Sequence, residues 1–476
     1  MKQKIALSLF AALTIPAMSA TNAELEAMLS KLQNEFDTYK TAQEKKYAVL
    51  EKELASKEEK KKRPRTQKKT EPEASKSGEI KEGFLDLAAD TVTTDTYESF
   101  SDLGLAASKV YNSDTALSIG GYGEFKAKKY TDFKNYSNAT NNETRKKLES
   151  NVVRFVPYIG YKFNDWIVMN TEIEFEDGGA RSDDTKNYKY AIVEFSYLDF
   201  MFDEKYNLRL GHVLVPFGNI NLNHEPVSFL TAERPLVETL IIPSTWHTNG
   251  ALLYGSYEEF DYYAGIITSP DAGRFKEGRF IQQGRLGARQ FTDDLSGVAR
   301  VDYTGISGME LGGSLFYGES SVLAQDKPGD AINTLDADLT MFMAEAHASY
   351  KENGWDIQAL AVYGTLGDGY ANLNTATNTI SGAVNGQYLT VGYDFLHSMS
   401  TSQKLFGVAE VERLDLDADS ETGNPDNYRF NEYTLGLAYY PDPKVVVKAE
   451  YNMKDYAENA NLADEEAIIA SLGFIF

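Results

Sequence analysis

The chain ends with Ile468-Ile-Ala-Ser-Leu-Gly-Phe-Ile-Phe476, in which every second side chain is apolar and the last residue is aromatic. Side chains along a strand alternate between its two faces. One face would therefore carry Ile468, Ala470, Leu472, Phe474 and Phe476. An apolar face that ends in an aromatic ring suits a strand in lipid, with the ring at the membrane interface. The stretch predicts the closing strand of a transmembrane β-barrel.

Strand-like alternation extends back from this end to Tyr111 and predicts sixteen strands in an all-β, antiparallel barrel. We expect these strands near residues 116–130, 150–163, 165–177, 187–202, 205–217, 249–257, 260–269, 294–304, 308–318, 338–351, 354–366, 384–396, 402–413, 428–440, 443–453 and 466–476. Tight turns such as Asn164-Asp165 and Asn353-Gly354 alternate with long loops, which is the asymmetry of an outer-membrane barrel. A soluble β-sandwich is the alternative, but it would not sort its connections in this way.

The predicted third strand shows what the barrel would enclose. Its charged residues Glu172, Glu174 and Glu176 interleave with Ile173 and Phe175. A charged side chain that faces hydrocarbon at the membrane centre costs about 2–4 kcal/mol. The glutamates should therefore face the interior, which in a barrel of this size is wide enough to hold water.

The N-terminus predicts export from the cytoplasm. Lys2 and Lys4 precede an apolar run from Ile5 to Ile15, and small residues follow at Ala17 and Ser19. We interpret residues 1–19 as a signal peptide. The alternative is a membrane anchor, which needs about 20 consecutive apolar residues.

Two further segments precede the barrel. Residues 20–56 repeat mostly apolar triplets at intervals of eleven residues, which predicts a self-associating periplasmic coiled coil. The alternative is a lone solvated helix. Residues 57–110 begin with a basic run around Pro64 and predict a linker with a short helical lead-in to residues 111–476, the barrel. The basic run could contact peptidoglycan or lipid headgroups, or serve only as a solvated spacer.

The third long loop, residues 218–248, is far more apolar than a loop in water should be. Phe229, Leu230, Ile241 and Trp246 need burial, and the barrel interior is the nearest cover. We expect the loop to fold inward and to constrict the pore. The candidate pore-lining residues are Glu225, Glu233, Arg234 and Glu238 from the loop, with Arg154, Glu172, Glu174, Glu194, Arg209, Arg300, Glu410 and Lys448 from the wall. The same charges could instead form salt bridges that hold the loop in place.

Several motifs resemble the family of phosphate-selective porins O and P. They include Gly160-Tyr-Lys-Phe-Asn-Asp165, Val215-Pro-Phe-Gly218, Arg234-Pro-Leu-Val-Glu238 and Ile242-Pro-Ser-Thr-Trp246. The resemblance covers residues 100–476 and implies a trimeric porin of sixteen strands, with the third loop folded into the channel. Phosphate-selective members bind anions through rows of Arg and Lys, whereas the candidates here are mixed and lean acidic.

The sequence therefore predicts an outer-membrane porin for small hydrophilic solutes or ions. Its expected partners are outer-membrane lipid, lipopolysaccharide and two further copies of the chain. The alternatives are an envelope tether that uses the coiled coil, and a phosphate- or anion-selective channel. The net charge of −24 argues against nucleic-acid binding, and the chain has no cysteine. Its five histidines match no nucleophile or metal-ligand motif, so we expect neither catalysis nor a cofactor.

Overall fold

A computed structural model of the chain describes residues 99–133, 147–178, 191–285, 294–320, 339–375, 378–419, 424–462 and 464–476. Its elements are the short helix α3 (Lys109–Asn112) and the strands β1 (Leu117–Phe133), β2 (Glu149–Asn164), β3 (Ile167–Glu176), β4 (Ala191–Met201), β5 (Asn207–Leu214), β6 (His247–Tyr257), β7 (Phe260–Thr268), β8 (Leu295–Ile306), β9 (Met309–Ser320), β10 (Leu339–Glu352), β11 (Trp355–Leu366), β12 (Ala383–Asp394), β13 (Lys404–Asp415), β14 (Arg429–Asp442), β15 (Val445–Tyr456) and β16 (Glu465–Ile475). The predicted signal peptide, the coiled coil and residues 57–98 of the linker lie outside the described residues.

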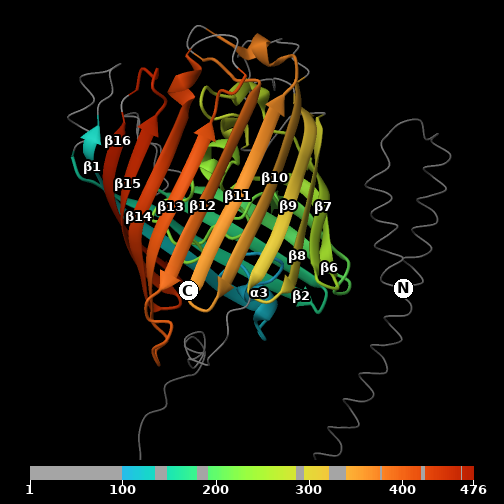
Figure 1. The fold of residues 1–476 in the computed structure, drawn as a ribbon. Helices are drawn as coiled ribbons and strands as arrows, with labels where there is room; N and C mark the ends of the chain where they lie inside the picture. The colour runs from blue at the N-terminus through green and yellow to red at the C-terminus, as the bar shows by residue number, and fades with distance from the viewer. Residues whose placement is uncertain are drawn as a thin grey trace, which may run out of the picture. The chain divides into compact units, whose positions relative to one another are not determined.

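The strands form one closed antiparallel barrel, in which each strand pairs with its neighbours in sequence and β1 pairs with β16 (Figure 1). The register of the closing pair sets Phe125 opposite Leu472 and Tyr122 opposite Ile475. Closure leaves no unpaired sheet edge, which is the only way a sheet can satisfy its backbone hydrogen bonds within lipid. The predicted sixteen-stranded barrel is confirmed.

The tight turns gather at one end of the barrel, where helix α3 and the C-terminus also lie (Figure 1). In the turn between β10 and β11, Asn353 and Gly354 both have positive φ, at 55° and 83°. Two successive left-handed residues define a type I′ turn, whose twist matches that of the flanking strands. The Asn-Gly pair therefore determines this hairpin through its backbone preference.

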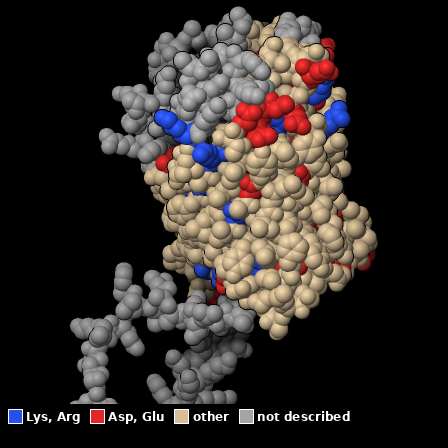
Figure 2. Space-filling view, turned by 60° about the vertical axis from the view of Figure 1, so that its left-hand side comes forward, with Lys and Arg blue, Asp and Glu red and all other residues tan. Residues whose placement is uncertain are grey.

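The outer face of the wall is apolar, as the alternation predicts. Large side chains that are more than half exposed include Leu315, Tyr317, Leu435 and Ile468. Figure 2 shows a broad band with few charges over the wall, with Asp, Glu, Lys and Arg concentrated toward the end that carries the long loops. Among the described residues, no helix is long and apolar enough to cross a membrane.

The inner face carries the buried residues, because segments of the chain fill much of the interior. The loop between β5 and β6, residues 215–246, contributes Phe217, Ile241 and Trp246 to the main hydrophobic cluster. Residues 99–112, which precede β1, contribute Leu103 and Ala106 to the same cluster. The barrel therefore encloses a packed partition rather than an empty tube.

Candidate functional site: the partition inside the barrel

The loop of residues 215–246, called loop 3 below, crosses the interior from β5 to the opposite wall. At one side, the Asn219 side chain donates a hydrogen bond to the Tyr388 hydroxyl of β12, with a distance of 2.9 Å. Farther along, Pro226 approaches Gly473 of β16 so closely that a Cβ at that glycine would lie 2.5 Å from the proline Cβ. Apolar loop residues are thereby covered by the wall.

Glu233 forms the main ionic contact between loop 3 and β1. Its carboxylate lies 2.8 Å from Lys126 Nζ and 2.7 Å from Lys128 Nζ. Burial alone would raise the pKa of Glu233, but the two ammonium groups outweigh this effect and lower its pKa to about 2. This carboxylate therefore stays ionised throughout the physiological pH range.

Wall residues also hold the loop through its backbone. In β15, Glu450 accepts a hydrogen bond from the Ala232 N–H at 2.6 Å, and Lys448 donates to the carbonyl oxygens of Phe229 and Thr231 at 2.6 and 2.8 Å. A buried backbone amide without a partner is costly, so such bonds maintain the non-repetitive loop in an enclosed space. The charged groups of Glu450 and Lys448 are consequently engaged in hydrogen bonds with the backbone of loop 3.

Glu238 has a similar role at the other side of the partition. It accepts hydrogen bonds from the Ile220 N–H at 2.8 Å and from the Tyr388 hydroxyl at 2.5 Å. Burial raises the pKa of Glu238 to about 7, although both bonds oppose the rise. Its charge therefore changes near neutral pH, unlike that of Glu233.

Residues 99–112, called the lead-in segment below, pack against the loop at the short-turn end. The Gly104 N–H donates to the Leu222 carbonyl of loop 3 at 3.2 Å, and the Asn170 side chain of β3 donates to the Ala107 carbonyl at 2.8 Å. Within residues 99–112, the predicted lead-in is α-helical only over Lys109–Asn112, and the positive φ values of Ser101 and Asp102 exclude a helix at those two positions.

A cavity of about 200 Å³ remains between the lead-in segment, the first part of loop 3 and the wall. Charged residues that line it are Asp102, Arg300, Glu310 and Lys351. Burial raises the pKa of Asp102 to about 7, although the neighbouring Arg300 lowers it. The cavity brings both signs of charge to one narrow space.

The structure places each predicted pore-lining residue on loop 3 or on the inner face of the wall. Loop 3 carries Glu225, Glu233, Arg234 and Glu238, while the wall carries Arg154 in β2, Glu172 and Glu174 in β3, Glu194 in β4, Arg209 in β5, Arg300 in β8, Glu410 in β13 and Lys448 in β15. Most are buried, and Arg300 alone also lines the cavity described above. That the set lines a conducting path stays a prediction.

The partners of these residues explain their burial. Arg209 forms two hydrogen bonds with Asp199, at 2.9 and 3.0 Å, and its guanidinium lies over the Tyr197 ring. Arg154 pairs with Glu124 at 3.1 Å and approaches Glu174 at 3.6 Å. Sequence reasoning missed Asp199 and Glu124. Their positions on inward-facing strand residues are the signal that could have identified them.

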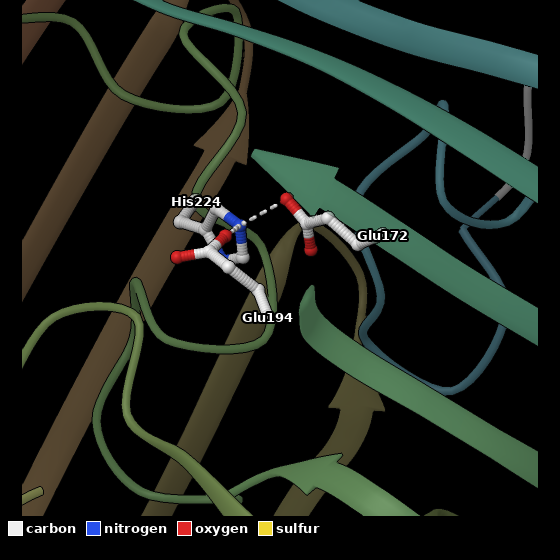
Figure 3. Close-up of side chains that lie close together, drawn as sticks. All are labelled: Glu172, Glu194 and His224. Carbon is white, nitrogen blue, oxygen red and sulfur yellow. Dashed lines mark hydrogen bonds and ion pairs between the residues drawn. The ribbon is translucent and has the colours of Figure 1, made fainter. Parts of the chain in front are cut away.

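Glu172, Glu194 and His224 lie together where loop 3 passes β3 and β4 (Figure 3). His224 Nε2 is 3.3 Å from Glu172 Oε1 and 3.5 Å from Glu194 Oε2, and all three side chains are buried. Burial lowers the pKa of His224, but the two carboxylates outweigh it and raise the pKa to about 10. Sequence reasoning did not bring these three residues together, because they belong to three different segments.

The comparison with curated proteins finds one relative over most of the chain. It is described as an uncharacterized protein of Aquifex aeolicus (strain VF5), and it is 30% identical over 411 residues, which cover 83% of this chain and 87% of the relative. The chain belongs to the same family as this Aquifex protein. No protein-family model matches the chain, so the resemblance to the phosphate-selective porins O and P stays a prediction.

Solved structures with a related shape include outer-membrane proteins. OmpT of Vibrio cholerae shares 13% identity with a TM-score of 0.46, over 76% of this chain and 99% of that one. The anion-selective porin of Comamonas acidovorans shares 11% with a TM-score of 0.47, over 76% and 99%. The outer membrane channel DcaP of Acinetobacter baumannii shares 12% with a TM-score of 0.45, over 76% and 97%. The strand pairing of this chain itself, not these likenesses, establishes its closed barrel.

Proposed function

We propose that the protein is an outer-membrane porin, through which small hydrophilic solutes or ions diffuse passively and which loop 3 constricts. The observation that carries this proposal is a closed barrel with an apolar outer face and a charged inner face, crossed by a loop that the wall holds in place. Soluble proteins rarely expose large apolar surfaces, so an outer wall of leucine, tyrosine and isoleucine side chains favours a position in lipid.

We expect the channel to be unselective or weakly selective for cations. Arg154, Arg209 and Arg300 on the inner wall each pair with a carboxylate, and Lys448 donates to backbone carbonyls. A row of free cations, which would attract phosphate, is not formed by these side chains. The overall charge of −24 supports the same expectation, because acidic linings attract cations.

The deciding experiment is a planar-bilayer recording of the full chain with a salt gradient. The sign of the reversal potential reports whether cations or anions pass more readily. We expect conductance steps with weak cation preference and no block by added phosphate. Absence of conductance would contradict the porin function, whereas strong anion preference with phosphate block would favour the phosphate-selective alternative.

We further propose that the outer face of β3–β6 contacts other copies of the chain in a homotrimer. Across this face the strand register aligns Thr171, Ser196, His212 and Asn249 in one row. Ser196 lies 3.1 Å from Thr171, and His212 lies 2.8 Å from Asn249, with both distances between side-chain polar atoms.

The surroundings of this polar row are apolar. The neighbouring row toward the short-turn end consists of Met169, Leu198, Leu210 and Ala251. Polar side chains in the middle of an apolar wall are unfavourable in lipid and are better accommodated between subunits. Strands β3–β7 are also short, with 8–11 residues against 12–14 in β8–β15.

A further inference from the structure

The group formed by Glu172, Glu194 and His224 has the composition of a metal site. Two carboxylates and one imidazole offer one ligand atom each, and these atoms all lie within 4.8 Å of one another (Figure 3). Mixed nitrogen and oxygen ligands suit divalent ions such as Zn²⁺, Co²⁺ and Mn²⁺. The three residues come from β3, β4 and loop 3, so an ion here would join the loop to the wall.

The orientation of His224 is the first independent observation. Its Nδ1 lies 2.9 Å from the carbonyl oxygen of Asn221, to which a protonated Nδ1 would donate. This bond leaves Nε2 facing the two carboxylates. Histidines that bind metals almost always donate their other ring N–H to a carbonyl or carboxylate, which fixes the ring and its tautomer.

The isolation of Glu194 is the second observation. The residue is 0% exposed, and neither of its carboxylate oxygens has a hydrogen-bond partner among the described residues. One oxygen of the fully buried Glu172 also lacks such a partner. A buried carboxylate without hydrogen bonds is unfavourable unless a cation compensates it. Arg154 and Arg285 attract Glu194 electrostatically, but neither forms a hydrogen bond with its oxygens, and the imidazole of His224 is the ring that faces them.

The distances agree with a shared ion. Ligand atoms at about 2.0–2.1 Å from a tetrahedral ion lie about 3.3–3.5 Å from each other. The two distances from His224 Nε2 are 3.3 and 3.5 Å. We propose that Glu172, Glu194 and His224 bind one divalent transition-metal ion of the Zn²⁺ type, which fixes loop 3 to the wall. The proposal is independent of what the barrel transports.

A second group, Asp302, Glu310 and His347, provides a matched comparison. Both ring nitrogens of His347 are engaged, with Nε2 2.8 Å from Asp302 and Nδ1 2.9 Å from Glu345. The Arg300 guanidinium lies 2.7 Å from Asp302. Arg300 thus lies beside Asp302 and 3.7 Å from Glu310, so a protein cation already compensates these two carboxylates. We therefore treat this group as an ion-pair network.

The test uses the full chain in detergent after chelator treatment and buffer exchange. Co²⁺ is titrated first, because tetrahedral Co²⁺ absorbs visible light, and Zn²⁺ is then added to displace it. Bound metal is counted by mass spectrometry. Glu194→Gln and His224→Gln are compared with His347→Gln as the control. His212→Gln is a second control, because His212 Nε2 lies 2.7 Å from His247 Nδ1 and offers no ligand atom to the group.

We expect one ion per chain, with tetrahedral Co²⁺ absorption, and an affinity reduced more than tenfold in Glu194→Gln and His224→Gln. Both controls should bind as the natural protein does. Gel mobility without heating reports whether each variant has folded. If His224→Gln fails to fold, Glu194→Gln decides the question, because loss of one carboxylate leaves the His224–Asn221 bond in place. No bound metal, equal affinity in Glu194→Gln, or loss of binding in His212→Gln would overturn the proposal in favour of a simple His224–carboxylate ion pair.

Discussion

The Glu225 carboxylate accepts hydrogen bonds from the backbone N–H groups of Ala106 and Ala107, at 2.9 and 3.0 Å. It thereby joins loop 3 to the lead-in segment, more than 100 residues earlier in the chain. A Cβ on Gly104 would lie 2.3 Å from the same carboxylate, so only glycine allows this approach. A buried side chain of loop 3 thus adds two hydrogen bonds to the other contacts that hold the lead-in segment in the barrel.

Replacing this carboxylate should loosen the lead-in segment. In Glu225→Ala the two N–H groups lose their acceptor inside the protein, which costs about 1–3 kcal/mol for each unsatisfied group. We expect larger single-channel conductance, because the segment would occupy the pore less tightly. The exposed Glu204→Gln in the β4–β5 turn is the control, and unchanged conductance in Glu225→Ala would contradict a role of the segment in limiting flow.

Glu233→Gln should change ion preference. The substitution leaves Lys126 and Lys128 without their partner and adds positive charge to one side of the interior. We expect the reversal potential in a salt gradient to shift in the direction that reports greater anion permeability. Because the Glu233 pKa is about 2, the natural protein should keep its preference down to about pH 3. An identical reversal potential in the variant would remove Glu233 from the conducting path.

Glu238 should make stability depend on pH near neutrality. Burial raises its folded-state pKa to about 7 from 4.5, so the stabilising form is the protonated one. Its contribution is fully present below pH 4.5 and is lost as the pH rises through 7. We expect Glu238→Gln to reduce the change in unfolding free energy between acidic and alkaline pH by about 1–3 kcal/mol. Thermal unfolding at a series of pH values measures this change. Parallel curves of stability against pH for the variant and the natural protein would contradict the assignment.

The polar row on the outer wall should stabilise the oligomer. His212→Leu and Asn249→Leu make this face apolar, which suits lipid but removes polar contacts from a subunit interface. We expect both variants to dissociate at lower temperature in detergent, as measured by light scattering during chromatography. Leu435→Ala, on the outer face of β14, serves as the control. Greater stability of the His212→Leu oligomer, or a natural protein that is monomeric, would place this face in lipid.

The barrel could be predicted because each of its strands obeys a local rule. Alternation along β16 places Ile468 and Leu472 outward. The turn between β10 and β11 follows from the backbone preferences of Asn353 and Gly354 alone. The interior could not be predicted to the same depth. That Glu225 meets Ala106, or that His224 meets Glu194, depends on where an irregular loop turns within a closed space. No periodic pattern in the sequence predicts such contacts between distant residues.

Loop 3 also has a consequence for the junction between the first and last strands. Glu233 binds Lys126 and Lys128 of β1, while the adjoining Ala232 binds Glu450 of β15, so neighbouring loop residues hold both sides of β16. Separation of β1 from β16 must therefore break either the ionic contacts with β1 or the amide contact with β15, as well as the backbone ladder. During insertion, these contacts can form only when the two ends of the sheet meet. The loop thus adds its binding energy to the last step of assembly, and it resists lateral opening of the finished wall.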